Sequence, residues 1–290
     1  FLSDGAMNMK ITKTLISLAA LVCFASTAPA QRLVALDGAG PFLNEVHAPP
    51  GVVAPPFAPS GPPCNLAAGL PPFPPGSAFP SMGGDAIDEQ GGRMYATDGI
   101  IMTSSPYPGC APTPPIPWGA WLPGRCGPIG GPPIIAMADA AGAGFLWILD
   151  AAQVVSLVPV LPGPPVLQVL APAPFPGAFM TSLTWDPSSN TLYFVEVGTT
   201  PGTPAAVYQT PTPTATVCVP LPIIGSVPIP PCLPPPYVGV TVNTTAFVPA
   251  GGIPPIYVTD GVFLADLSTG GCPGPILPPA AIPVTDLDFA

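Results

Sequence analysis

The chain of 290 residues contains 52 prolines and 32 glycines, yet 48% of its residues are hydrophobic and only 7% are charged. Proline at this frequency excludes a protein of long helices, the absence of a three-residue glycine period excludes collagen, and the apolar content argues against a disordered chain. The formal net charge of −10 argues against binding to nucleic acid and disfavours anionic membrane surfaces. Short strands joined by Pro/Gly-rich turns are the architecture that remains.

Residues 1–30 predict a secretory signal peptide preceded by a few upstream residues. Lys10 and Lys13 supply the positive start, Leu15–Phe24 is an apolar stretch, and Ala28-Pro29-Ala30 gives the small residues expected before a cleavage site. Neither this stretch nor any later one reaches the roughly 18 proline-free apolar residues of a membrane span. We therefore expect a secreted mature chain without a membrane span, located outside the cell, in the periplasm or at the cell surface.

Residues 31–82 are expected to contain one or more N-terminal strands and a Pro-rich segment. Leu33–Gly38 matches the late strands of a repeat unit further along the chain. A strand of this kind at the N-terminus can close a ring of sheets, because pairing it with the last sheet removes an open edge. The sequence thus indicates a possible closing strand here.

A repeat of about fifty residues organises residues 83–290. Four short strands carry an aromatic residue followed three positions later by an acid, with 52, 46 and 64 residues between successive aromatics. The pairs are Tyr95 and Asp98, Trp147 and Asp150, Tyr193 and Glu196, and Tyr257 and Asp260. Each of these strands is preceded by another short strand and a tight turn, and is followed by a further apolar stretch. In the last repeat the preceding strand is expected at Thr245–Phe247. The unit is therefore three or four antiparallel strands, the usual content of a propeller blade, with the aromatics packed between sheets.

The segment Leu183–Glu196 resembles the repeats of secreted bacterial YVTN/NHL-type β-propellers, and its pattern recurs at Ile256–Asp260. The resemblance implies an all-β propeller from a family of extracellular binding, scaffold and occasionally lactonase or lyase proteins. Val284–Ala290 matches the first strand of a further blade. We expect an incomplete propeller of about four blades plus the start of a fifth, truncated at its C-terminus, with Pro-rich connecting loops. In the full protein we expect six to eight blades and a partner blade that is missing here. A β-sandwich is the alternative fold.

Two sets of acids recur with the repeat. Asp98, Asp150, Glu196 and Asp260 share one position, and Asp88, Asp139 and Asp186 share another. One interpretation is a ligand- or Ca²⁺-binding ring of carboxylates at the channel mouth, because Ca²⁺ prefers hard oxygen ligands. The other is turn chemistry, in which a carboxylate at a strand end accepts backbone N–H bonds from the next turn. Recurrence favours the turn, since a catalytic constellation normally breaks the repeat symmetry.

The residues that support catalysis are scarce. The one histidine, His47, has no Gly-x-Ser-x-Gly elbow to serve, and zinc and nucleotide fingerprints are absent from the sequence. The leading prediction is a non-catalytic binding or structural module with an extracellular protein or glycan partner. One alternative is a lactonase- or lyase-like enzyme with a divalent metal at the channel mouth. Another is a lectin-like propeller in which Trp118 and Trp121 stack on sugars.

Six cysteines remain after removal of the signal peptide, and export makes disulfides their expected state. Cys110 and Cys218 fall late in their repeat units, while Cys126 and Cys232 precede the next units by a few residues. This spacing predicts the disulfides Cys110–Cys126 and Cys218–Cys232, each closing one Pro-rich excursion at its base. Cys64 and Cys272 are expected either to bond to each other or to leave Cys272 without a partner in this chain.

Overall fold

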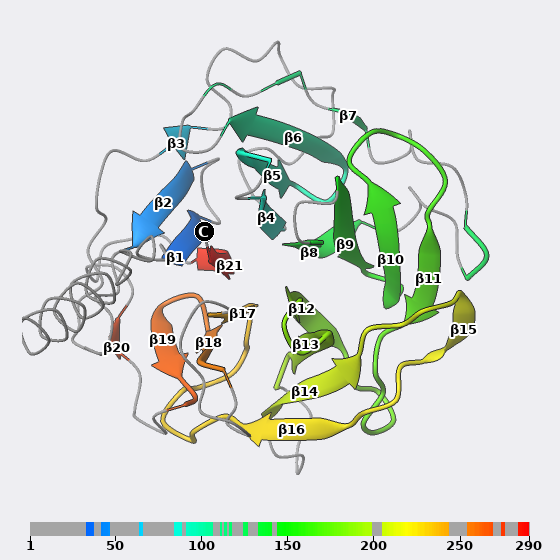
Figure 1. Ribbon diagram of the computed structural model, residues 1–290. Helices are drawn as coiled ribbons and strands as arrows, with labels where there is room; N and C mark the ends of the chain where they lie inside the picture. The colour runs from blue at the N-terminus through cyan, green and yellow to red at the C-terminus, as the bar shows by residue number, and fades with distance from the viewer. Residues whose placement is uncertain are drawn as a thin grey trace, which may run out of the picture. The chain divides into compact units, whose positions relative to one another are not determined.

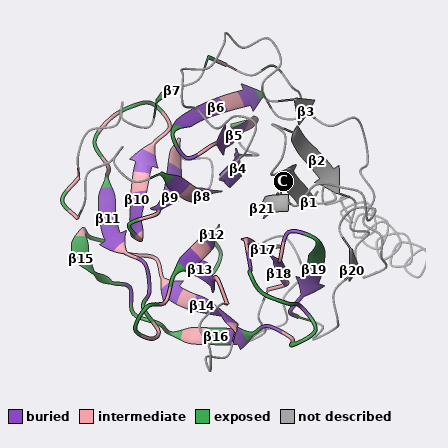
Figure 2. Ribbon diagram, turned by 180° about the vertical axis from the view of Figure 1, so that it is seen from behind, coloured by how far each residue is buried: buried purple, intermediate pink, exposed green. Residues whose placement is uncertain are grey.

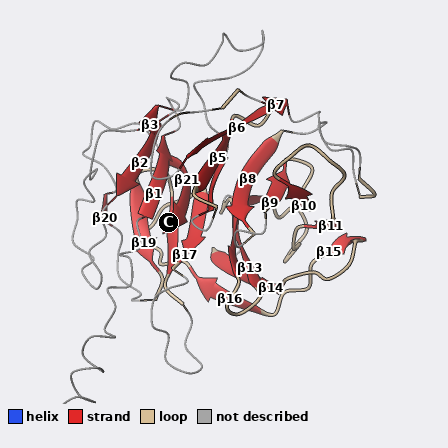
Figure 3. Cartoon of the chain, turned by 45° about the horizontal axis from the view of Figure 1, so that its top comes forward, coloured by secondary structure: helices blue, strands red, loops and turns tan. Residues whose placement is uncertain are grey.

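The computed structural model describes residues 33–37, 42–46, 64–65, 84–88, 91–106, 111, 113–114, 116–117, 124–126, 133–140, 144–198, 205–243, 254–268, 274–275 and 284–289. Arg32–Ala290 form one compact unit. Every regular element in the described ranges is a β-strand, as Figures 1 and 3 show. These ranges contain no helix with the length and hydropathy needed to cross a bilayer. The all-β class expected from the sequence is confirmed.

The strands form five sheets, which we name the first to fifth blades. The first blade contains β4 (Gly84–Asp88), β5 (Arg93–Thr97), β6 (Ile101–Pro106) and β7 (Ile116–Pro117). The second contains β8 (Ile134–Asp139), β9 (Phe145–Asp150), β10 (Val154–Pro159), β11 (Leu167–Leu170) and β15 (Val217–Pro220). The third contains β12 (Met180–Asp186), β13 (Thr191–Glu196), β14 (Ala206–Pro211) and β16 (Gly225–Pro228). The fourth contains β17 (Gly239–Val242), β18 (Ile256–Thr259), β19 (Phe263–Asp266) and β20 (Gly274–Pro275). The fifth contains β21 (Val284–Phe289), β1 (Leu33–Asp37), β2 (Phe42–Val46) and β3 (Cys64–Asn65).

The fifth blade joins strands from opposite ends of the compact unit. β21 pairs antiparallel with β1, so that Leu33 lies opposite Phe289. The inner strands β4, β8, β12, β17 and β21 each contact the next, and β21 contacts β4, which closes the ring (Figure 1). Four consecutive blades and the start of a fifth at β21 are confirmed. The expectation of a missing partner blade, and with it of six to eight blades, is wrong, because β21 itself pairs with β1. Since β1 pairs with an inner strand, it is the second strand of its blade and not a late one.

Small residues line the inner strands where neighbouring blades meet. Four small residues on the inner strands occupy equivalent positions, because each pairs with the residue just before the recurring acid of the second strand. The four are Gly84, Ala136, Ser182 and Gly239. A Cβ added at Gly84 would lie 2.9 Å from the Cα of Ala136, too close for any side chain. At the third and fourth blades, the backbone N–H of Val240 donates to the Ser182 hydroxyl at 3.2 Å. At these two interfaces the blades therefore meet through small residues, and at Gly84 a larger side chain does not fit.

The hydrophobic core lies between the facing surfaces of adjacent blades. On β9, Leu146 and Ile148 pack toward the first blade, whereas Trp147 and Leu149 pack toward the third. On β13 the same alternation places Phe194 against the second blade, and Tyr193 and Val195 against the fourth. Because side chains alternate across a strand, a strand buried on both faces must be apolar at nearly every position. Figure 2 shows this burial concentrated on the strands nearer the centre of the second and third blades.

Three of the four repeat aromatics, Tyr95, Trp147 and Tyr193, pack between blades as the sequence predicts. Tyr95, Trp147 and Tyr193 are buried. Tyr257 is half-buried, and its burial, together with the charge of Asp266, raises the pKa of the phenol to about 12. One expected strand is placed differently: β18 pairs with Gly239–Val242, while the expected strand at Thr245–Phe247 lies outside the described residues.

Candidate functional site

The first set of recurring acids lies at the ends of the second strands, where the chain turns into the third strand of each blade. In the first blade, Asp98 Oδ1 accepts hydrogen bonds from the backbone N–H groups of Ile100 and Ile101 at 2.8 and 2.9 Å. Asp260 Oδ1 accepts the equivalent two bonds in the fourth blade at 2.8 and 2.7 Å. Gly99 and Gly261 follow these acids with φ of 92° and 95°, a left-handed conformation that glycine adopts without strain. The two Thr-Asp-Gly turns are thus built alike.

The other two acids of this set also accept backbone hydrogen bonds in turns. Asp150 Oδ1 accepts from Ala152 at 2.9 Å and from Val154 at 3.0 Å. Its burial raises the pKa of the carboxyl, and these two hydrogen bonds oppose that rise. In the third blade, Glu196 Oε2 accepts from the N–H of Gly198 at 2.7 Å. All four acids therefore have carboxylate oxygens engaged by their own hairpins.

The second set of acids is less uniform than the sequence suggests. Asp88 accepts a hydrogen bond from Gly91, and Asp186 accepts bonds from the backbone N–H and hydroxyl of Ser188. Asp139, however, pairs with Leu146 and so takes the register position of Trp185 rather than that of Asp186. The equivalence assigned to Asp139 is therefore wrong by one residue.

A metal centre is not assembled by these side chains in the described ranges. No three His, Cys, Asp or Glu residues gather there in a group that could hold a metal ion. The turns place each acid of the first set in a different blade. A Ca²⁺ or ligand role for Asp98, Asp150, Glu196 and Asp260 stays a prediction. Trp118, Trp121, Cys110 and His47 lie outside the described residues.

The disulfide pattern differs from the predicted one. Cys126 is bonded to Cys218, 92 residues away, with their Cα atoms 5.0 Å apart. Cys232 is disulfide-bonded as well, but not to Cys218. Both predicted pairs, Cys110–Cys126 and Cys218–Cys232, are therefore wrong.

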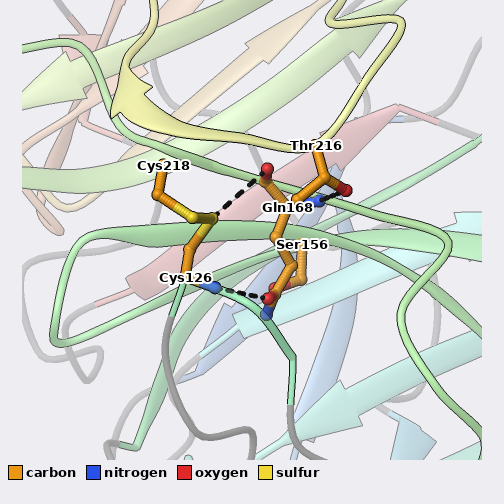
Figure 4. The surroundings of a disulfide bond; sticks show 5 residues. All are labelled: Cys126, Ser156, Gln168, Thr216 and Cys218. Atoms are coloured by element: carbon orange, nitrogen blue, oxygen red, sulfur yellow. Dashed lines mark hydrogen bonds between the residues drawn. A yellow bond between two sulfur atoms is a disulfide. The ribbon is translucent and has the colours of Figure 1, made fainter.

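The physical reason is that strand β15 leaves its own blade. The chain departs from the third blade after β14, and β15 pairs in parallel with β11 of the second blade before β16 returns to the third. This crossover carries Cys218 to the outer edge of the second blade, beside the connection that contains Cys126 (Figure 4). Repeat spacing assigns each cysteine to the blade before or after it in sequence, and the crossover breaks that assumption.

Gln168 on β11 holds both segments against the second blade. Its buried side chain donates to the Ser156 hydroxyl at 3.0 Å and accepts from the Cys126 N–H at 3.1 Å. Its backbone N–H donates to the Thr216 hydroxyl at 3.1 Å. A Cβ at Gly124 would overlap the Gln168 amide, so a larger residue there would displace the Gln168 side chain. Figure 4 shows Gln168 between the disulfide and Thr216.

A pocket of about 580 Å³ lies at the beginning of β11 and β15. Its walls include Arg125, Thr216 and Gln168 together with Pro164, Pro165 and Val166. The volume is within the range of small ligand pockets, which typically measure about 300–1,000 Å³. Stiff proline rings and a few polar groups therefore surround a space large enough for one or two side chains of a partner.

The strand beside this pocket is exposed along its whole length. β15 is the outermost strand in the order of the second blade, and all four of its residues are exposed (Figure 2). Val217 and Val219 retain 48% and 58% of their surface. We name the rim site the pocket, with Arg125 and Thr216 in its wall, together with the exposed residues Val217 and Val219 of β15.

The charge at the rim site contrasts with the acidity of the chain. Arg125 is exposed and makes no ion pair with a residue in the described ranges. Arg93, the other arginine in those ranges, is half-buried and donates to the Ser104 hydroxyl at 3.0 Å. The rim site thus presents a cation on a chain whose formal net charge is −10. The scarcity of positively charged residues was the one signal in the sequence that could have pointed to Arg125. Nothing in the local sequence distinguishes Gln168 or Thr216.

Comparisons with known proteins agree with the fold. No family model and no curated protein sequence matches the chain. Many solved structures resemble it, among them a chain from the crystal structure of a nidogen/laminin complex. That match has a TM-score of 0.52 and 12% identity, and covers 90% of this chain and 98% of the other. At this identity the likeness concerns the fold alone, and with the five-bladed ring it identifies the protein as a β-propeller. The bacterial YVTN/NHL type stays a prediction.

Proposed function

We propose that this chain is a secreted, non-catalytic β-propeller that binds an extracellular protein through the rim site. The observation that carries the proposal is β15, an apolar strand that is fully exposed and lacks a neighbour on its outer side among the described strands. Soluble proteins normally shorten, charge or cover such edges, because an open apolar edge pairs with other chains. Pro220 ends this edge, but Val217 and Val219 leave it accessible.

Further features support an extracellular protein partner. The predicted signal peptide and the disulfides at Cys126 and Cys232 suit an oxidising compartment. One structure to which this chain is similar comes from a nidogen/laminin complex, so a fold of this kind occurs in an assembly of proteins. The acids of the repeat support hairpin turns, which favours a binding role for the rim over chemistry at the channel mouth.

The test is a binding screen of the oxidised protein against an array of purified secreted and matrix proteins. Val219→Lys is the diagnostic variant, because it places a charge on the exposed face of β15. Val262→Lys is the matched control, since Val262 is 47% exposed in a turn of the fourth blade. We expect a partner whose affinity falls at least tenfold with Val219→Lys and stays unchanged with Val262→Lys. An array without partners, or partners that are indifferent to Val219→Lys, would contradict the proposal.

A further inference from the structure

The rim site offers a short strand that is held in place before any partner binds. At its beginning, the Thr216 hydroxyl accepts the Gln168 N–H, and at its end the Leu221 N–H donates to the Leu170 carbonyl at 3.0 Å. Between these points the disulfide fixes Cys218 to Cys126. An edge held at both ends and in the middle loses little conformational entropy when a second strand pairs with it. β15 is therefore suited to accept an added strand.

The length of β15 limits what backbone pairing can contribute. Pro220 has no N–H, so a ladder of hydrogen bonds along the outer edge must stop there. Only Val217, Cys218 and Val219 remain to pair with an incoming strand. A ladder this short needs a second source of affinity. The pocket lies at the beginning of the same strand, bordered by Thr216 and Arg125.

The charge of the pocket defines the complementary group. Arg125 is exposed there and makes no ion pair with a described residue. The guanidinium group presents paired N–H donors that match the two oxygens of a carboxylate. A second copy of this chain is disfavoured as occupant, because each copy has a formal net charge of −10 and like charges repel.

We infer that the rim site binds an extended segment of the partner, which adds as a strand to the outer edge of β15 and places an Asp or Glu side chain beside Arg125. This inference rests on the proposed function and names its recognition element. Backbone pairing along Val217–Val219 sets the path of the segment. The carboxylate fixes its register, since an apolar strand of three residues would otherwise allow slippage.

The first experiment uses an array of random heptapeptides with acetylated and amidated ends, probed with the oxidised protein. The blocked ends remove terminal carboxylates, so any acid requirement belongs to a side chain. We expect the bound peptides to share one Asp or Glu next to alternating apolar residues. Arg125→Gln should weaken these peptides at least tenfold, but leave analogues with Gln in place of the acid unchanged. Arg93→Gln removes the same charge from the first blade and should have no effect on either.

The second experiment tests pairing with β15 directly. Successive N–H groups of a strand point to opposite edges, so N-methylation of alternate residues separates the two edges of a bound peptide. We expect methylation of one alternating set to abolish binding and methylation of the other set to leave it within about twofold. Equal effects of both sets would overturn strand addition. Unaltered affinity in Arg125→Gln, or a requirement for a free C-terminus in unblocked peptides, would overturn the acidic side chain.

The outcomes separate this inference from the function on which it rests. If folded secreted proteins bind and lose affinity with Val219→Lys, while no peptide binds, the recognition of an extended segment is wrong and the binding function stands. If neither proteins nor peptides bind, both are wrong. A partner that proves to be a second copy, detected as a dimer by sedimentation, would overturn the assignment of a foreign acidic segment.

Discussion

The inner hairpins of the blades and the rim of the second blade follow different rules. In the inner hairpins, pairing occurs between strands adjacent in sequence, the side chains are buried, and the turns repeat from blade to blade, as in the Thr-Asp-Gly turns at Asp98 and Asp260. At the rim, β15 pairs with a strand of the preceding blade, in parallel, and a disulfide joins residues 92 positions apart. Burial between blades enforces the repeat at the centre, whereas the exposed rim is free to depart from it.

The largest difference between the two regions should appear on truncating a side chain. Phe194 is fully buried between the second and third blades, so Phe194→Ala should lower the free energy of unfolding by about 3–5 kcal/mol. Val219→Ala at the rim should change it by less than about 0.5 kcal/mol, because Val219 is exposed. Urea denaturation of both oxidised variants measures the contrast. Similar losses in the two variants would show that β15 is part of the core.

The disulfide should account for the next largest effect. Replacing both Cys126 and Cys218 by serine should lower the free energy of unfolding by about 2–5 kcal/mol, because the bond closes a long loop and restricts the unfolded chain. Hydrogen exchange should quicken in β15 and stay unchanged in β13. Peptide mapping without reduction provides the control. A Cys110–Cys126 peptide in the native protein would contradict the bond on which this prediction depends.

The acids of the Thr-Asp-Gly turns should have a smaller effect. Asp98→Ala removes the acceptor of two backbone N–H groups and should cost about 1 kcal/mol, whereas Asp98→Asn keeps an acceptor oxygen and should cost less than half of that. Millimolar Ca²⁺ should leave the Tm of the protein unchanged if these acids serve only their turns. A Tm increase with Ca²⁺ that disappears in the combined Asp98→Asn and Asp260→Asn variant would instead establish the predicted ion site.

The smallest effect concerns the pH dependence of Asp150. Burial raises the pKa of this carboxyl in the folded protein, so its protonated form is favoured by folding. The resulting contribution to stability is fully present below the unfolded pKa of about 3.9 and is lost as pH rises through the folded pKa. Relative to Asp150→Asn, the native protein should therefore gain stability as the pH is lowered through that interval. A difference that is constant with pH, measured by urea denaturation in a buffer series, would contradict the direction of the shift.

The sequence by itself determined the class of the fold and the inner architecture of the blades. The spacing of Tyr95, Trp147, Tyr193 and Tyr257 marks the second strands, because burial on both faces demands apolar residues in a local pattern that sequence displays directly. The hydrogen-bonded turns at Asp98 and Asp260 are likewise local, since donor and acceptor lie within three residues.

The sequence indicates a possible closing strand at Leu33–Gly38, but only the tertiary structure shows which strand it pairs with, and it alone decided the disulfide and the rim site. β1 and β21 are separated by most of the chain, and the sequence of neither strand identifies the other as its pairing partner. The sequence likewise gives no sign of the crossover of β15, which places Cys218 beside Cys126 instead of beside Cys232, its neighbour in sequence. Thr216 meets Arg125 and Gln168 only because of that crossover. Contacts between distant segments depend on how whole blades pack, and that packing is a property of the assembled ring rather than of any one segment.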